Sequence, residues 1–264
     1  MSSLTYIYHD CFLYRTRTAT GREIAILFDY MRDPDGRLWS LIPDNVFLYV
    51  LVSHFHKDHY SPDIFRQASR AGGAHYILSR DVARHARHIL TPGTLYKGVR
   101  PAVGQVTILS KGDKYCDENV EIHAFGSTDI GNSYVVRVSG GDVLFHAGDL
   151  NLWSWRDEST AGEIAAAKRD YECELQPIAE RFPEFDYAMF PVDSRIGTLY
   201  WEGAEIFLKR INVKRFFPMH FELADNDGQR MQRHRDALRF DLYAPQRGEM
   251  IGLTAPYSLY WCAT

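Results

Sequence analysis

The chain has 264 residues, of which 45% are hydrophobic, and its formal net charge is −4 at pH 7. That length suits one large α/β domain, and so high an apolar content can bury a substantial core. The mild negative charge implies no broad attraction to nucleic acid or to an anionic membrane, so functions that need a highly basic surface are disfavoured.

Cysteine usage and the N-terminal sequence bear on where the protein works. The four cysteines are widely scattered and form no C-x-x-C pair, which predicts free thiols in a reducing compartment. Acidic residues occur too early for a signal peptide, and no apolar run approaches the roughly 18 residues of a membrane helix. We expect a single cytoplasmic domain over residues 1–264, with no nucleic-acid or membrane partner. A homo-oligomer would be unsurprising, although no residue argues for it.

The first third of the chain is rich in predicted strands. Residues 46–52 are continuously apolar, and the run is too short for a typical helix, so we predict a strand buried on both faces. Ser61 followed by Pro62 is a good helix start with serine as the N-cap. The elements expected up to residue 90 are strand-like stretches at 6–14, 23–29, 46–52 and 75–78, and helices beginning at 61–63 and spanning 81–89.

Strands and helices continue to alternate after residue 90. Residues 139–142 read Ser-Gly-Gly-Asp between two apolar runs, which predicts a hairpin turn. Thr160 and Glu163 have capping-box spacing, and a kink is expected near Pro177 of the helix that follows. The expected elements are strands at 120–125, 134–138, 143–146, 187–190 and 215–217, and helices at 160–182 and 203–210. Strand-rich blocks interrupted by helices predict a layered α/β sandwich.

The most informative string follows the buried strand at once. Residues 53–60 read Ser-His-Phe-His-Lys-Asp-His-Tyr, so His54, His56, Asp58 and His59 fall within six residues. A chain that leaves a strand in a tight turn can direct several side chains at one point. Imidazole suits Zn, Fe, Ni or Mn, while carboxylate favours the harder of these ions. The string therefore predicts a metal centre; the alternative is a set of surface histidines in a polar loop.

The H-x-H-x-D-H pattern after a hydrophobic strand resembles the signature of the metallo-β-lactamase superfamily. Further landmarks occur in the order typical of that family. Phe28-Asp29 ends an early strand, residues 146–149 read His-Ala-Gly-Asp, and residues 217–220 read Phe-Pro-Met-His. The resemblance spans residues 5 to 221, and the first motif is the most specific.

The resemblance implies a fold and a ligand set. The fold would be an α/β (α+β) four-layer αββα sandwich with the site along one edge of its two sheets. One or two divalent ions would bind there, zinc first, with Mn, Ni or Fe as alternatives. The implied assignment is His54 and His56 to one metal, Asp58, His59 and His220 to the other, Asp149 between the two, and Asp29 in a supporting position.

One family landmark is altered. Members usually carry a G-H-T segment whose histidine completes the first metal site, and here residues 126–129 read Gly-Ser-Thr-Asp. Serine is a poor zinc ligand, so Ser127 does not replace that histidine. Either Asp129 supplies an oxygen, or a single metal binds at the other position. An ordinary turn aspartate is the alternative reading of Asp129. The Gly-Ser-Thr-Asp variant resembles an uncharacterised bacterial branch of the superfamily.

The remaining histidines carry less information. His123 and His146 lie on predicted strands close to the motifs, and we interpret them as satisfied or supporting side chains rather than ligands. No ligand spacing singles out the others, which are His9, His75, His85, His88 and His234.

A metal site of this kind predicts hydrolysis. A Lewis-acidic ion lowers the pKa of bound water towards neutrality, and the resemblance implies that Asp58 orients the nucleophile and accepts its proton. Trp153 and Trp155 are candidates for a pocket mouth, with packing against the next helix as the alternative. Arg195 is a candidate to bind a phosphate or carboxylate, with a salt bridge to Asp193 as the alternative.

The predicted function is hydrolysis of a small ester-like bond, with a phosphoester or phosphodiester slightly favoured over a lactone or amide. Two other classes stay open. One is a non-catalytic or sensory metal-binding protein of the same fold, and the other is a non-haem iron redox protein.

Overall fold

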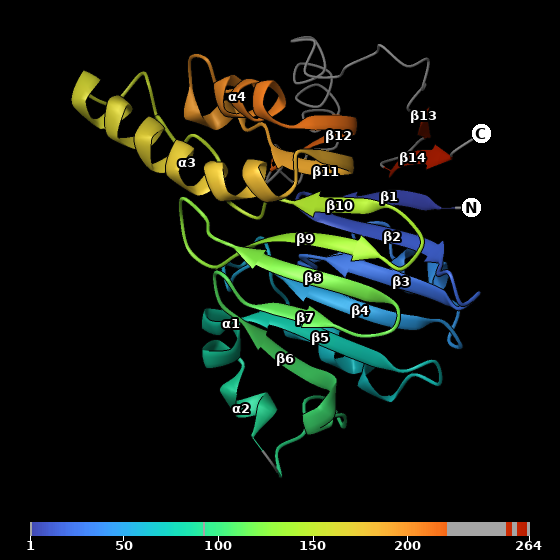
Figure 1. The fold of residues 1–264 in the computed structure, drawn as a ribbon. Helices are drawn as coiled ribbons and strands as arrows, with labels where there is room; N and C mark the ends of the chain where they lie inside the picture. Colours follow the sequence, from blue (N-terminus) through green and yellow to red (C-terminus); the bar gives the residue numbers. More distant parts are fainter. Residues whose placement is uncertain (1, 92, 221–251, 255–257, 263–264) are drawn as a thin grey trace.

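The computed structural model describes residues 2–91, 93–220, 252–254 and 258–262. One group of strands comprises β1 (Ser3–Tyr8), β2 (Cys11–Arg17), β3 (Glu23–Phe28), β4 (Phe47–Val52), β5 (Ala74–Ser79), β6 (Val106–Leu109), β13 (Gly252–Thr254) and β14 (Ser258–Cys262). The other comprises β7 (Lys114–Cys116), β8 (Val120–Phe125), β9 (Ser133–Val138), β10 (Val143–His146), β11 (Glu184–Pro191) and β12 (Asn212–Met219). They form an eight-stranded sheet, β13-β14-β1-β2-β3-β4-β5-β6, and a six-stranded sheet, β12-β11-β10-β9-β8-β7 (Figure 1).

Helical segments connect and cover these strands. The α-helices are α1 (Arg80–His85), α2 (Arg87–Leu90), α3 (Ala161–Arg181) and α4 (Glu202–Arg210), and the 3₁₀ turns are η1 (Leu38–Leu41), η2 (Pro62–Ser69), η3 (Val103–Gln105) and η4 (Ser194–Ile196). Thr160 caps α3 through a capping box with Glu163, as its sequence spacing predicts. Ser61 caps the segment after it as expected, but that segment is the 3₁₀ turn η2 rather than an α-helix.

Two hydrophobic cores explain why the strands of the larger sheet are apolar on both sides. Along β4, Tyr49 and Leu51 belong to the core between the sheets, whereas Leu48 and Val50 belong to a core on the opposite face. The first core also includes Tyr171 and Leu175 of α3 and Phe207 of α4, and the second includes Phe65 of η2, Val82 of α1 and Ile89 of α2. Helices therefore cover the outer face of each sheet. The expected αββα sandwich is confirmed.

The structure corrects the expectation of one strand-like stretch at residues 6–14. A two-residue turn, His9-Asp10, divides it into β1 and β2, whose hairpin pairs Tyr8 with Cys11. His9 has a positive φ of 56°, a conformation that is uncommon outside glycine but that asparagine, aspartate and histidine adopt more readily than other residues. With neither glycine nor asparagine at the turn, the sequence gives no strong hairpin signal there.

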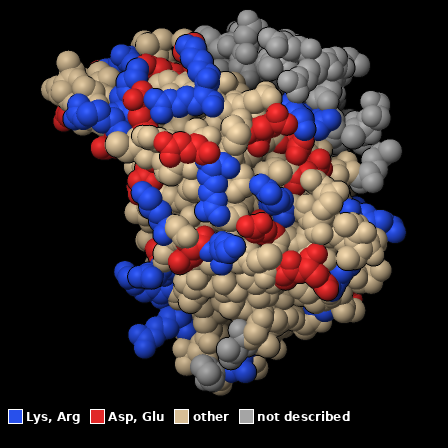
Figure 2. Space-filling view, viewed as in Figure 1, with Lys and Arg blue, Asp and Glu red and all other residues tan. Residues whose placement is uncertain are grey.

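Two surface observations bear on binding partners. No helix among the described residues is long and apolar enough to cross a bilayer. On the face shown in Figure 2, basic and acidic side chains are interspersed, so this face offers no extended basic surface for a polyanion.

Candidate metal centre

Strand register brings six distant segments to one edge of the sandwich. In the larger sheet, Phe12 at the start of β2 lies opposite Phe28 at the end of antiparallel β3, and β4 runs parallel to β3. The residues that flank these strand ends, Asp10, Asp29 and the string 53–59, are therefore neighbours. In the smaller sheet β10, β11 and β12 are parallel, so the residues that follow them share an edge as well. These residues are Asp149, Asp193 and His220.

Four side chains make up the first group of candidate ligands, namely His54, His56, Asp129 and Asp149, whose ligand atoms lie within 4.8 Å of one another. His54 Nε2 is 3.1 Å from His56 Nδ1 and 3.3 Å from Asp149 Oδ2. His56 Nδ1 is 3.5 Å from Asp129 Oδ2. Asp129, in the same loop as Ser127, is therefore close enough to His56 to supply an oxygen ligand to the same ion. Gly131 lets this loop approach, because a Cβ there would lie 2.1 Å from the Ser53 carbonyl oxygen.

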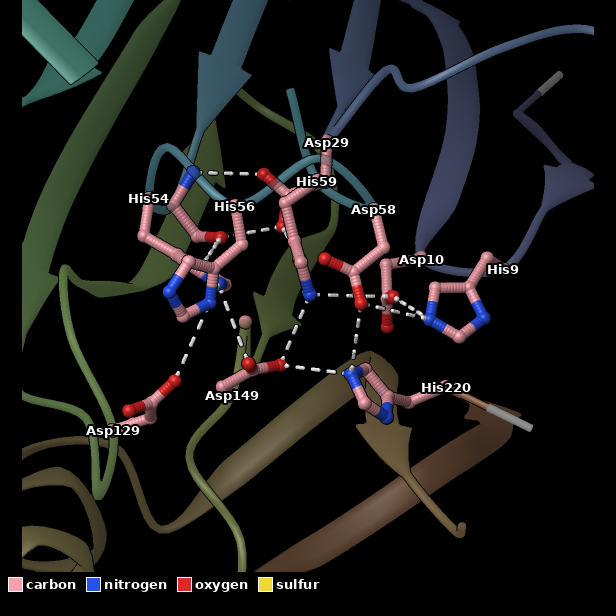
Figure 3. Close-up of polar contacts among 12 residues, drawn as sticks. His9, Asp10, Asp29, His54, His56, Asp58, His59, Asp129, Asp149 and His220 are labelled. Atoms are coloured by element: carbon pink, nitrogen blue, oxygen red, sulfur yellow. Dashed lines mark hydrogen bonds and ion pairs between the residues drawn. The ribbon is translucent and has the colours of Figure 1, made fainter. Parts of the chain in front are cut away.

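A second region lies on the other side of Asp149 (Figure 3). Asp149 Oδ1 is 3.1 Å from His59 Nε2 and 3.3 Å from His220 Nε2. The ligand atoms of His9, Asp58 and His220 lie within 4.8 Å of one another, and so do those of Asp10, His59 and His220. The structure thus places Asp149 between the two regions. It brings Asp58 beside His220 as the resemblance implies, and it adds His9 and Asp10.

Several buried polar atoms face this region without hydrogen bonds. Both carboxylate oxygens of Asp10, Asp149 Oδ1, His59 Nε2 and His220 Nε2 make no hydrogen bond of acceptable geometry with the described residues. Leaving such an atom buried and unsatisfied costs about 1–3 kcal/mol, and more when it is charged. A cation bound in this region would provide a partner for several of these atoms.

The spacing of these atoms fits ligands that share an ion. Two ligand atoms that are each about 2.1 Å from one metal are separated by roughly 3.0–3.4 Å at tetrahedral or octahedral angles. The separations around Asp149, 3.1 to 3.3 Å, lie in that range. The His56–Asp129 distance of 3.5 Å is slightly longer. The donor set, imidazole nitrogen with carboxylate oxygen, suits a divalent transition metal.

Asp29 orients the metal-binding string. Its Oδ2 lies 2.8 Å from His59 Nδ1, and its Oδ1 accepts the Ser53 backbone N–H at 2.7 Å. With Nδ1 donating to Asp29, His59 presents Nε2 as an acceptor towards the cluster. Asp29 has a φ of 41°, so the backbone adopts a disfavoured conformation to place this carboxylate. Asp29 thus contacts the histidine that would bind the metal, which is the supporting position that the resemblance implies.

His220 is oriented in the same way by a different carboxylate. His220 Nδ1 lies 3.0 Å from Asp193 Oδ2, which leaves Nε2 facing Asp149. Arg195 forms a bidentate salt bridge with Asp193, Nε to Oδ1 at 3.0 Å and Nη2 to Oδ2 at 2.5 Å. The salt bridge considered as the alternative for Arg195 is therefore present. His220 has a φ of 61°.

The electrostatics of the second region are those of a cation site. Burial raises the pKa of Asp10 to about 7. Burial would lower the pKa of His220, but the carboxylates of Asp10 and Asp149 outweigh it and raise that pKa to about 9. The pKa of His59 is raised well above its usual value against burial, again by Asp149 and Asp10. The neighbouring carboxylates thus favour positive charge at these two imidazoles, whereas burial and the His220 imidazole lower the pKa of His9 to about 3.

The sequence interpretation missed His9 and Asp10 because neither has ligand spacing within the chain. Both are fully buried in the β1–β2 turn, and His9 Nε2 lies 3.2 Å from Asp10 Oδ2. His146 holds this turn, since its Nε2 donates to the Asp10 carbonyl at 2.8 Å and its ring stacks on Phe28. His146 is therefore a supporting residue, as expected.

The other histidines lie outside these groups. His123 pairs with Glu121, His75 contacts Thr107, and His85 stacks on Phe55. His88 belongs to none of the groups. His234 lies outside the described residues.

A cavity of about 390 Å³ opens beside the cluster. It is lined by Thr128, Asp129, Asp149, Trp153, Trp155, Asp193, Arg195 and His220. Trp153 Nε1 donates to the Asp149 carbonyl at 2.8 Å, so this side chain also supports a candidate ligand. All three residues singled out for substrate binding therefore face one cavity that borders both groups.

No protein-family model matches the chain, and no curated protein matches it. Solved structures do resemble it. The metallo-β-lactamase-fold protein YhfI from Bacillus subtilis aligns with a TM-score of 0.54 at 11% identity, over 90% of this chain and 93% of that one. A metallo-β-lactamase superfamily protein from Thermotoga maritima aligns with a TM-score of 0.42 at 17% identity, over 87% of this chain and 80% of that one. BJP-1, a subclass B3 metallo-β-lactamase of Bradyrhizobium japonicum, aligns with a TM-score of 0.40 at 13% identity, over 70% of this chain and 75% of that one.

The likeness to the Bacillus protein extends over nearly the whole of both chains. It agrees with the helix–sheet–sheet–helix layers of this chain. The chain therefore has the metallo-β-lactamase fold.

Proposed function

We propose that the protein is a metal-dependent hydrolase with a dinuclear centre. The observation that carries this proposal is the set of buried, inward-facing nitrogen and oxygen atoms on both sides of Asp149, several of which make no hydrogen bond. His54, His56 and Asp129 would hold one ion, His59 and His220 with the adjoining Asp58 would hold the other, and Asp149 would contact both. Zinc is the first candidate, with Mn, Ni or Fe as alternatives.

The bound ions would supply a water of lowered pKa and a positive charge that stabilises the leaving oxygen. Asp58 would orient that water and accept its proton; its carboxylate is a quarter exposed and lies 3.6 Å from His9 Nε2. Although burial opposes it, His9 and the other nearby imidazoles hold the pKa of Asp58 well below its usual value. Asp58 is therefore ionised at neutral pH and can accept a hydrogen bond that orients the water.

The cavity indicates a small substrate. A volume of about 390 Å³ lies at the lower end of the range typical of small-molecule sites. Arg195 keeps Nη1 free of hydrogen bonds to the described residues while Nε and Nη2 bind Asp193. The guanidinium is thus rigidly held and can still bind an anionic group. This favours a phosphoester or phosphodiester slightly over a lactone or amide, and Trp155, 42% exposed, would cover the substrate.

We also propose that the protein works in the cytoplasm. Cys11, Cys116 and Cys173 are free thiols in the structure, which is the usual state of cysteines in a reducing compartment.

Metal content is the decisive measurement. Protein purified without added metal or chelator should contain about two equivalents of divalent metal by elemental analysis, and His220→Ala should lose about one of them. Asp58→Asn should weaken binding of the ion held with His59 and His220, and with both positions saturated by added metal it should lower kcat on p-nitrophenyl phosphoesters by about 10²- to 10⁴-fold. Absence of bound metal after reconstitution would refute the proposal.

The same experiments separate the other classes. Iron as the bound metal, with visible absorbance that changes on reduction, would indicate a redox protein. Tightly bound metal with no turnover of any phosphoester, lactone or activated amide would indicate a sensory or structural role.

A further inference from the structure

The β1–β2 turn directs a carboxylate at the metal cluster that the H-x-H-x-D-H string does not account for. Asp10 is fully buried, and neither of its carboxylate oxygens makes a hydrogen bond with the described residues. The His146 imidazole donates a hydrogen bond to the Asp10 backbone carbonyl and so holds this residue in place. The neighbouring His9 has a positive φ of 56°. A disfavoured turn that buries an unsatisfied acid is expected only where the acid has a function.

The carboxylate of Asp10 is surrounded by imidazole nitrogens of the candidate metal centre. Its Oδ2 lies 3.6 Å from His59 Nε2 and 3.2 Å from His9 Nε2. A hydrogen bond from His59 Nδ1 is already taken by Asp29, so Nε2 is the atom that His59 offers to Asp10 and to Asp149. The ligand atoms of Asp10, His59 and His220 lie within 4.8 Å of one another (Figure 3), and the 3.6 Å between Asp10 Oδ2 and His59 Nε2 is slightly longer than the roughly 3.0–3.4 Å of two ligands on one ion.

We propose that Asp10 is a ligand of the ion held by His59 and His220, and that its carboxylate shifts this position towards manganese(II) relative to zinc. The inference rests on the metal centre proposed above. With Asp10 the position has carboxylates from Asp10 and Asp149 beside two imidazoles, and Asp58 adjoins it. More oxygen ligands and a higher coordination number favour manganese over tetrahedral zinc.

The alternative is a purely structural buried acid that forms an ion pair with protonated His59. The two roles make opposite predictions for Asp10→Asn. A metal ligand leaves an unfavourably buried carboxylate in the metal-free protein, so its removal should leave that form at least as stable. A structural ion pair should make the metal-free variant less stable and leave metal binding intact.

The experiment compares wild type, Asp10→Asn and a matched control, Glu121→Gln. Glu121 is a carboxylate that also pairs with a histidine, His123, but it lies on β8 outside the cluster. Each protein is stripped of metal and titrated with MnCl2, with free Mn²⁺ followed by its electron paramagnetic resonance signal, and then with ZnCl2 by calorimetry. Thermal unfolding is recorded with and without metal. Asp10→Ser, which keeps a small polar side chain in the turn, serves if the asparagine variant fails to fold.

We expect wild type and Glu121→Gln to bind about two Mn²⁺. In Asp10→Asn one of these ions should bind at least tenfold more weakly, the affinity for Zn²⁺ should fall by a smaller factor, and the rise in Tm on adding Mn²⁺ should shrink. Unchanged stoichiometry and Mn²⁺ affinity in Asp10→Asn would overturn the assignment while leaving the metal centre intact. Absence of binding by wild type would instead refute the centre itself, and this inference with it.

Discussion

Replacing Asp29 by asparagine should remove the control that the protein has over His59. The change is nearly isosteric, and asparagine tolerates the positive φ of 41° at this position. Its oxygen can still accept the Ser53 backbone N–H, as the carboxylate does now at 2.7 Å. The amide nitrogen, however, would face His59 Nδ1, where the carboxylate oxygen now lies at 2.8 Å.

The expected consequence is a reversed tautomer. An amide N–H donates to Nδ1, which then carries no proton, and the proton moves to Nε2, the atom that faces Asp149 and Asp10. A protonated Nε2 cannot bind a metal. Loss of a supporting carboxylate of this kind typically lowers metal affinity by 10- to 100-fold, which is about 1.4–2.8 kcal/mol. Asp29 Oδ2 also accepts a hydrogen bond from the Ser53 hydroxyl, and losing the charge-assisted bonds from this hydroxyl and from His59 Nδ1 should lower the stability of the metal-free protein by about 1–3 kcal/mol as well.

Equilibrium dialysis at pH 7.5 with elemental analysis measures the first quantity, and urea denaturation in the presence of chelator measures the second. The affinity for the ion held by His59 should fall, and the ion held by His54 and His56 should stay bound. Glu121→Gln again provides the control. Wild-type affinity for both ions in Asp29→Asn would show that the orientation of His59 does not depend on this carboxylate.

Three further predictions follow from the geometry. Metal affinity should rise with pH up to about 9, because the pKa of His220 is raised to about 9 and the ring must lose its proton to bind; calorimetry in two buffers of different ionisation enthalpy should detect proton release at pH 7. Asp117 accepts hydrogen bonds from Tyr49, Tyr115 and two backbone amides, which outweigh burial and lower its pKa. Its stabilisation is therefore present above about pH 4 and lost on acidification, and Asp117→Asn should cost about 1–2 kcal/mol at pH 7 and flatten the acid limb of a urea-denaturation series. Leu175→Ala should lower the free energy of unfolding in urea by about 2–5 kcal/mol without changing metal content, because this side chain of α3 is fully buried in the first core. A smaller loss would mean that the helix repacks around the cavity.

The sequence alone was sufficient for features that local spacing encodes. The apolar run before residue 53 specifies a buried strand, and the structure has β4 there with residues in both cores. The string from His54 to His59 is compact because all its members leave one strand end. Thr160 and Glu163 determine where α3 begins. Each of these depends on residues a few positions apart, so composition and periodicity are enough to predict them.

The set of residues that completes the cluster is a tertiary property. His9 and Asp10 are distant from the string in sequence and carry no motif, and they reach it because the β1–β2 turn lies beside the ends of β3 and β4. Likewise, whether Asp129 is a turn residue or lies beside His56 depends on how the β8–β9 loop packs against Ser53. Local sequence determines which side chains leave a strand end together. Only the register and packing of the two sheets determine which distant side chains they meet, because those contacts are made between segments whose separation along the chain carries no periodic signal.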